Sequence, residues 1–120
     1  MDQVKTALDT LVEQEGINLA MIVSRDGFIV EMQKGRDLTT DPETIGAALS
    51  TFWDHTDSMG KELTAKTGLN SIVEFQGAVV ATSLIEAEDL LLAVVADPKT
   101  NPATMRYLTA KFSELLTRSL

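Results

Sequence analysis

The stretch from Asp41 to Gly68, DPETIGAALSTFWDHTDSMGKELTAKTG, decides the fold because it carries the longest helical pattern of the chain. Asp41 supplies an N-cap carboxylate, and Pro42 occupies the first helical position, where proline is favoured. Gly68 is placed to end the helix in a left-handed conformation. Apolar residues recur with the period of an amphipathic helix, and we expect this stripe to cover the helix's own sheet: Ile45, Ala48, Leu49, Phe52, Met59 and Leu63.

A second line of residues runs beside this stripe. Gly46, Trp53 and Gly60 are seven positions apart, so they share one side of the helix, roughly 80° from the stripe at ~100° per residue. In one interpretation Trp53 covers the edge of the core, and each glycine costs about 1 kcal/mol of helix stability. In the other, which we favour, the glycines let a second helix approach, and Trp53 packs across the two-fold axis of a symmetric dimer.

The composition is that of a single domain spanning residues 1–120. Hydrophobic residues make up 44% of the 120 positions, which is enough for a core without disulfides, and the sequence has no Cys. No apolar run approaches the ~20 residues of a membrane span, and the first residues lack the pattern of a signal peptide. We therefore expect a cytoplasmic protein that does not insert into a membrane.

The charge distribution argues against nucleic acid as a partner. The formal net charge is -8, whereas phosphate binding is driven by an excess of Lys and Arg. The charge is uneven, because four basic residues and one acidic residue lie between Lys99 and the end, against six basic and seventeen acidic residues before it. This pattern predicts a basic last helix on an acidic body.

Around the central stretch, the sequence predicts two hairpins and two further helices. Residues 2–15 have a helical pattern that Gly16 is placed to end, and Asn101 and Pro102 begin a last helix. The two hairpins comprise residues 17–24 with 28–32, around Arg25-Asp26-Gly27, and residues 69–75 with 78–84, around Gln76-Gly77. Residues 90–96 are apolar throughout, which predicts a strand in mid-sheet that is covered on both faces.

The predicted class is therefore α+β, in the order helix, two strands, helix, three strands, helix. Hairpin connections make the five-stranded sheet mainly antiparallel. Three helices, each with one apolar stripe, can cover both faces of a sheet that is apolar on both sides. We expect the central helix on one face and the first and last helices on the other.

This order resembles that of the Roadblock family of dynein light chains and bacterial gliding-protein-B-like regulators. The resemblance covers nearly the whole chain and rests on four motifs in sequence: Leu8 and Leu11 before Gly16, the Ile22-Val23-Ser24-Arg25-Asp26-Gly27 hairpin, Leu90-Leu91-Leu92-Ala93-Val94-Val95, and Asn101-Pro102. The resemblance implies a homodimer in which the central helices pack side by side and the strands that follow them join two sheets into one. It also implies a non-enzymatic role as partner, regulator or activating protein of a Ras-like small GTPase, in signalling such as cell polarity or motility. Longer relatives have a C-terminal extension that is not found here, because the sequence stops at Leu120.

Two sets of residues are candidate sites under this resemblance. The expected dimer interface comprises Gly46, Leu49, Trp53, Gly60, Asn70 and Ile72. On the outer side of the same helix, the candidate GTPase contacts are Ser50, Asp54, Asp57 and Lys61, which in the simpler interpretation form only a solvated face. Tyr107, on the polar side of the last helix, either marks a contact surface or lies along its own helix. Arg25 is either a solvated turn residue, which we favour, or a cation that reaches a partner's phosphates as an arginine finger does.

No catalytic, metal or cofactor site is predicted. His55 is the only histidine, and we expect it to be a partly covered helical residue. Asp54 and Asp57 lack the distinct environments of a general acid and base. Glu86, Glu88 and Asp89 lack a calcium-loop pattern, and no glycine-rich phosphate loop is present. The alternative to a GTPase regulator is a small-molecule-sensing or scaffold domain of the same fold, because a sheet flanked by helices can hold a pocket.

Overall fold

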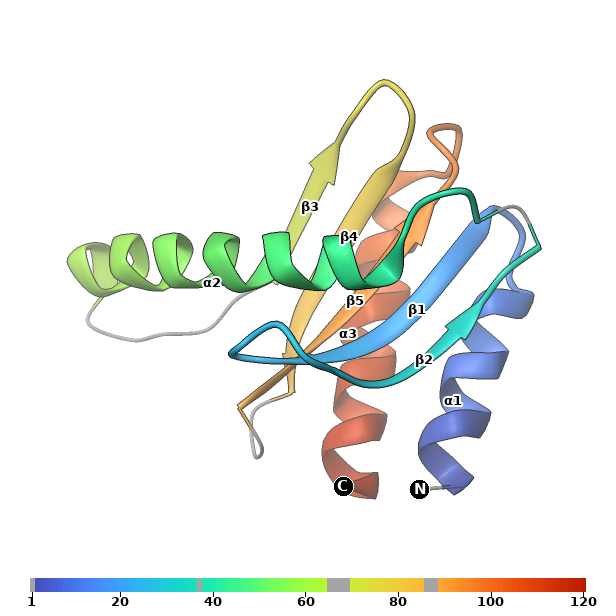
Figure 1. The fold of residues 1–120 in the computed structure, drawn as a ribbon, viewed down its shortest axis with the longest axis horizontal. Helices are drawn as coiled ribbons and strands as arrows, with labels where there is room; N and C mark the ends of the chain where they lie inside the picture. Colours follow the sequence, from blue (N-terminus) through green and yellow to red (C-terminus); the bar gives the residue numbers. More distant parts are fainter. Residues whose placement is uncertain (1, 37, 65–69, 86–88) are drawn as a thin grey trace.

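The computed structural model of the chain describes residues 2–36, 38–64, 70–85 and 89–120. The elements are α1 (Asp2–Glu13), β1 (Ile17–Ser24), β2 (Ile29–Lys34), α2 (Pro42–Thr64), β3 (Asn70–Glu74), β4 (Val79–Ile85), β5 (Leu90–Ala96) and α3 (Pro102–Ser119). This is the predicted order, and the fold is α+β (Figure 1). The predicted helix stop at Gly68 and the acidic residues Glu86 and Glu88 lie outside the described residues.

The five strands form one sheet in the order β2-β1-β5-β4-β3, and all four neighbouring pairs are antiparallel. Strand β5 lies at the centre, as the unbroken apolar run predicted, with Leu92 opposite Ile22 on one side and Ser83 on the other. The turn of the first hairpin is closed by a hydrogen bond from the Gly27 N–H to the Ser24 carbonyl at 2.9 Å. Gly27 has φ +89°, a conformation that favours glycine. Strands β2 and β3 are the two edges of the sheet.

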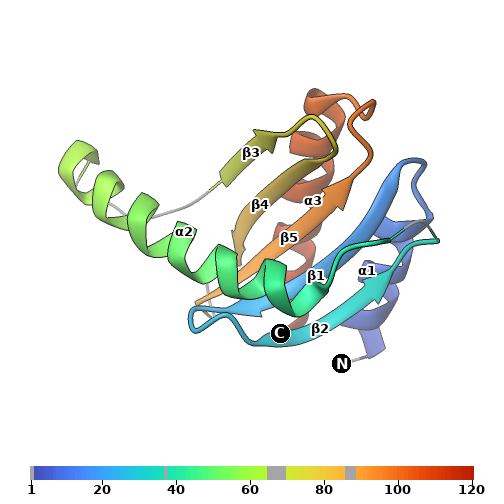
Figure 2. The same ribbon diagram turned by 45° about the horizontal axis from the view of Figure 1, so that its top comes forward.

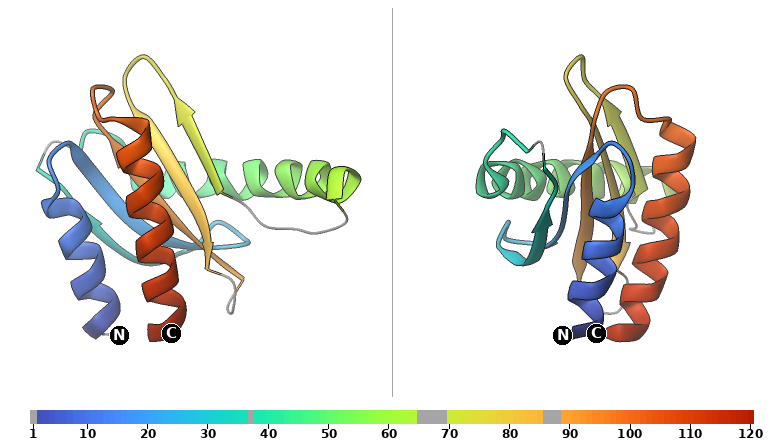
Figure 3. Two further views of the ribbon diagram at one scale, coloured as in Figure 1. Left: turned by 180° about the vertical axis from the view of Figure 1, so that it is seen from behind. Right: turned by 90° about the vertical axis from the view of Figure 1, so that its right-hand side faces the viewer.

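The sheet separates two layers of helices (Figure 3). Helices α1 and α3 cover one face, and α2 crosses the other, as predicted. Successive side chains of a strand point to opposite faces, so Ile22 joins the core beneath α1 and α3, whereas Met21 and Val23 join the core beneath α2. The core on the α1 and α3 side is the larger of the two.

Both predicted N-caps are present. The Asn101 side-chain oxygen accepts a hydrogen bond from the Ala103 N–H at 2.8 Å. The Asp41 carboxylate accepts from the Glu43 N–H at 3.3 Å and from the Thr44 hydroxyl at 3.0 Å. The bonds from the Ala103 and Glu43 N–H groups satisfy backbone donors that have no partner inside the helix, and they fix where α3 and α2 begin.

Helix α2 is longer than the sheet that it crosses (Figures 1 and 2). Its 23 residues span about 34 Å, whereas the axes of the two edge strands are about 19 Å apart at the usual strand spacing. The second half of α2 therefore projects beyond β3, and Met59 and Leu63 are 58% and 73% exposed. The expectation that the whole apolar stripe covers the helix's own sheet is wrong for these two residues.

Candidate protein interface on the central helix

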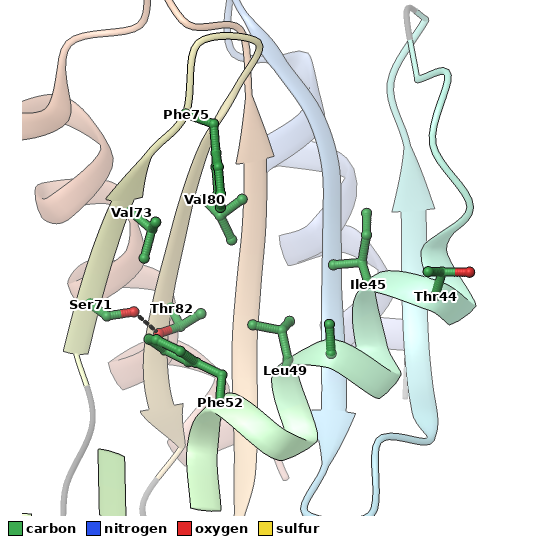
Figure 4. A pocket seen from close by; sticks show the side chains of 10 residues that line it. Thr44, Ile45, Leu49, Phe52, Ser71, Val73, Phe75, Val80 and Thr82 are labelled. Atoms are coloured by element: carbon green, nitrogen blue, oxygen red, sulfur yellow. Dashed lines mark hydrogen bonds between the residues drawn. The ribbon is translucent and has the colours of Figure 1, made fainter. Parts of the chain in front are cut away.

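A groove of about 370 Å³ runs between the first half of α2 and the β3-β4 hairpin (Figure 4). It forms because α2 passes over β1 and β5 and leaves the same face of β3 and β4 open. Its lining is Thr44, Ile45, Ala48, Leu49 and Phe52 of α2, Val80 and Thr82 of β4, and Ser71, Val73 and Phe75 of β3 and the residue after it. The strand residues alternate in sequence because every second side chain points to this face.

The groove presents an almost wholly apolar surface. Ser71 and Thr82 are hydroxyl residues in its lining, and their oxygens form a hydrogen bond with each other at 2.6 Å. These polar atoms are therefore satisfied within the subunit and do not require a polar ligand. Phe75 lies at one end of the groove and is largely exposed. Contiguous apolar surface of this kind is typical of a site where another molecule binds.

On the side of α2 that faces away from the groove, Arg25 connects the helix to the β1-β2 turn. The Arg25 Nε donates to Asp54 at 2.9 Å, and its Nη2 donates to Asp57 at 3.0 Å. The guanidinium carbon lies 4.7 Å from the centroid of the Trp53 ring, within the range of a cation–π contact. Ser50 completes the connection by donating its hydroxyl to the Arg25 carbonyl at 2.7 Å. We call Arg25, Ser50, Trp53, Asp54 and Asp57 the arginine clamp.

The electrostatics of the clamp keep Arg25 charged. Partial burial lowers the pKa of Arg25, but the hydrogen bonds and charges of Asp57 and Asp54 outweigh burial, so the pKa is raised above its ordinary value. Asp57 is the more enclosed partner, with its side chain 11% exposed, and it also lies 3.8 Å from the Lys61 Nζ. The clamp therefore contains one cation held between two carboxylates, with a second cation at its rim.

Comparison with known proteins agrees with this architecture. The family model described as the Roadblock/LC7 domain matches residues 3–96, which is most of the chain. The chain belongs to the Roadblock/LC7 domain family. No curated protein matches the chain in sequence.

Three solved structures show the same fold at low sequence identity. A structure of MglB with a tetrameric arrangement has a TM-score of 0.88 at 15% identity, over 98% of this chain and 87% of that one. The gliding protein MglB from Thermus thermophilus has a TM-score of 0.86 at 17% identity, with the same coverage. A Roadblock/LC7 domain from Streptomyces avermitilis has a TM-score of 0.80 at 17% identity, over 95% of this chain and 94% of that one.

Within this Roadblock/LC7 domain, two residues of the expected dimer interface contact their own subunit. Trp53 is 3% exposed and lies beneath Arg25. Gly46 is buried against the hairpin turn, where an added Cβ would lie 2.8 Å from the Gly27 carbonyl oxygen. The close approach that Gly46 permits is therefore to the β1-β2 turn.

The other residues of that set lie in different places. Gly60 is half-buried on the part of α2 that projects beyond the sheet. Leu49 lines the groove, whereas Asn70 and Ile72 belong to edge strand β3. Ile72 packs against the core beneath α1 and α3, and Asn70 contacts Ser83 at 2.6 Å. Their role in a dimer remains a prediction.

The four candidate GTPase contacts lie together, but three of them belong to the arginine clamp. Ser50, Asp54 and Asp57 bind Arg25, and Lys61 lies at the rim of the clamp beside Asp57. Asp54 and Lys61 remain largely exposed, so they are the two that a partner can reach directly. The structure agrees with neither interpretation of Arg25 that the sequence suggested. Its side chain is neither freely solvated nor a free cation, because it is paired with Asp54 and Asp57.

Neither the groove nor the clamp was predicted from the sequence. The groove depends on where α2 crosses the sheet, which the helical pattern does not reveal. A signal for the clamp was present, since Ser50, Trp53, Asp54 and Asp57 share one side of a helix and Arg25 lies in a turn. The prediction that His55 is partly covered is wrong, because the histidine is exposed on α2.

The described residues hold no group of three or more His, Asp or Glu side chains that could bind a metal ion. None of the described helices is long and apolar enough to cross a membrane. The chemistry that this surface supports is the binding of another molecule through apolar contact, with charged groups alongside.

Proposed function

We propose that this chain forms a homodimer through the α2 groove, and that the dimer binds and regulates a Ras-like small GTPase without itself being an enzyme. The observation that carries the proposal is the exposed apolar surface formed by the groove and by Met59 and Leu63. An apolar surface of this extent on a small acidic domain is stabilised when a partner removes it from water.

Several features support a second copy as the partner that fills the groove. The projecting half of α2 has no sheet of its own to cover, and β3 is an edge strand with unpaired backbone groups. A two-fold axis beside β3 would place the projecting half of one α2 over the β3-β4 face of the other copy. Each copy would then cover the surface that the other leaves exposed, as in an isologous interface. The MglB structure with a tetrameric arrangement is a relative in fold that self-associates.

The GTPase part of the proposal rests on membership in the Roadblock/LC7 family and on the clamp side of α2. Asp54 and Lys61 are exposed on that side, and the arginine clamp holds them in fixed positions relative to the hairpin. Because this side faces away from the groove, it stays accessible when the groove is filled. A charged, pre-ordered surface suits an encounter whose rate and specificity are set by electrostatics.

The test is a pull-down against Ras-like GTPases of the same organism, loaded with GDP or with a GTP analogue, followed by a hydrolysis assay. We expect at least one GTPase to bind in one nucleotide state. Lys61→Glu should weaken the binding, because it reverses a charge on the proposed contact side, and Arg36→Glu, an equal charge change in an exposed loop, should not. If no GTPase binds in either nucleotide state, the regulatory proposal is rejected.

The size and apolar lining of the groove favour one other function, a sensor for a small apolar molecule. A pocket of about 370 Å³ is within the range that accommodates such ligands. In that case the groove would be open in solution, and an apolar metabolite would raise the melting temperature of the chain. A homodimer that fills the groove excludes this function.

A further inference from the structure

Helices α1 and α3 form a second groove on the face opposite α2. The two helices lie side by side and antiparallel, with both chain ends at the same end of the layer (Figure 3). The groove between them has a volume of about 680 Å³ and is lined by Gln3, Thr6, Ala7, Thr10, Phe112, Leu115, Arg118 and Ser119. Leu115 is 45% exposed, although it is a leucine at the centre of the face. This face lacks a cover in the single subunit.

The two helices that border this groove have opposite charge. Helix α1 carries three acidic residues and one basic residue, whereas α3 carries three basic residues and one acidic residue. Asp9 and Glu13 are exposed on α1, and Lys111 and Arg118 are exposed on α3, where Arg118 forms an ion pair with Glu114 of its own helix at 2.7 Å. The α1 side of this face therefore has a net negative charge and the α3 side a net positive charge, to which Lys111, which is not in this ion pair, contributes.

We infer that this face binds a second copy of the same chain through its α1 and α3 helices. The argument is charge complementarity: a surface with one acidic and one basic rim is the complement of itself after a two-fold rotation. If the axis runs parallel to the helices and between them, α1 of each copy lies over α3 of the other. Acidic side chains then meet basic ones on both sides of the axis.

The alternative two-fold arrangement is excluded by the same charges. An axis that runs across the helices would stack α1 on α1 and α3 on α3. The acidic α1 of one copy would then face the acidic α1 of the other, and the two basic α3 helices would also face each other. Like charges in contact are destabilising, so only the axis parallel to the helices is favourable.

In the favoured arrangement, Leu115 lies near the axis. It lines the groove from α3, so the two copies of Leu115 approach each other and lose their exposure to water. Lys111 is exposed one helical turn before Leu115 on α3, so in this arrangement it would lie opposite the later half of the partner's α1, where Asp9 and Glu13 are located. This face is on the other side of the sheet from the α2 groove, so both can be occupied at once.

The experiment is sedimentation equilibrium of the full chain and its variants over a range of protein concentrations. Leu115→Glu places a charge at the axis and should halve the mass of the largest species. Asp9→Lys and Lys111→Glu should each weaken this association, because each puts like charges opposite each other. The double variant Asp9→Lys/Lys111→Glu should restore it, because the pair is then reversed. Arg36→Glu, an equal charge change elsewhere, should have no effect.

The outcomes separate this interface from the α2 groove. If Leu115→Glu and both single charge variants leave the mass unchanged, or if the unmodified chain is a monomer throughout, the inference is overturned. It is also overturned if the double variant associates no better than the single ones, since charge pairing then does not hold the copies together. A chain that forms dimers sensitive to Leu115→Glu, but not to a charge in the α2 groove, would support this interface and reject the proposed groove dimer.

Discussion

The guanidinium of Arg25 lies 4.7 Å from the ring centroid of Trp53 and bridges it to the carboxylates of Asp54 and Asp57. This relationship connects the tip of the first hairpin with the middle of α2, 28 positions later in the chain. The contact contributes to the burial of Trp53, which is 3% exposed.

Arg25→Ala is expected to uncover Trp53 and to lower the free energy of unfolding by about 1 kcal/mol, the sum of a cation–π contact and partly exposed ion pairs. Trp53 is the only tryptophan, so its fluorescence reports on the clamp alone. Acrylamide should quench the variant more strongly than the unmodified chain. Arg36→Ala, which removes an exposed arginine outside the clamp, is the control, and equal quenching of Arg25→Ala and the unmodified chain would contradict the clamp.

Gly46→Ala tests whether the glycine permits close contact with the β1-β2 turn or with a second helix. The added Cβ would lie 2.8 Å from the Gly27 carbonyl oxygen, so we expect a loss of about 1–3 kcal/mol from overpacking, despite the better helix propensity of alanine. Because this contact is within one subunit, the loss should not depend on protein concentration in urea unfolding. A loss found only at concentrations where the chain is a dimer would instead support the interpretation that Gly46 lets the α2 helix of a second copy approach. Gly77→Ala, where a Cβ meets nothing within 4 Å, is the matched control.

Ser83→Ala should destabilise the contact between α3 and the β3-β4 hairpin. The Ser83 hydroxyl lies 2.9 Å from the buried Ser113 hydroxyl and 2.6 Å from the side-chain oxygen of Asn70, an exposed residue of β3, so it links three elements. Removing its oxygen costs about 1 kcal/mol, because the Ser113 hydroxyl still donates to the Ala110 carbonyl and the exposed Asn70 can bind water. Thermal unfolding measures the effect, with exposed Ser58→Ala as control. A melting temperature equal to that of the control would mean that the link contributes nothing.

The order of elements could be predicted from the sequence because each is marked locally. Asn101 and Asp41 are N-caps with a proline directly after them, and Gly27 lies in the turn between β1 and β2 with a positive φ. Residues 90–96 are apolar on both sides, and this pattern predicts a strand at the centre of the sheet, where β5 lies. Such signals depend on residues that are close together in the sequence, so they can be recognised in one amino-acid sequence.

The candidate site was less predictable because it depends on contacts between distant residues. The spacing of Gly46 and Trp53 predicted a contact with a second helix, whereas in the single subunit both residues contact the β1-β2 turn. Spacing does not say whether the approaching element is a second helix or the chain's own hairpin, and the structure places the hairpin there. The exposure of Met59 and Leu63 likewise follows from the length of α2 relative to the width of the sheet.

The central claim is that a second copy of this chain fills the groove between α2 and β3. Ala47 and Ala48 are adjacent and exposed in the single subunit, but only Ala48 lines the groove. Neither Ala47→Glu nor Ala48→Glu should therefore unfold the subunit.

The most direct measurement is sedimentation equilibrium of these two variants beside the unmodified chain, with circular dichroism to verify folding. We predict that Ala48→Glu halves the mass of the assembly, because it places a charge in a buried apolar contact, whereas Ala47→Glu retains the mass of the unmodified chain. A folded Ala48→Glu variant with unchanged mass would contradict the account.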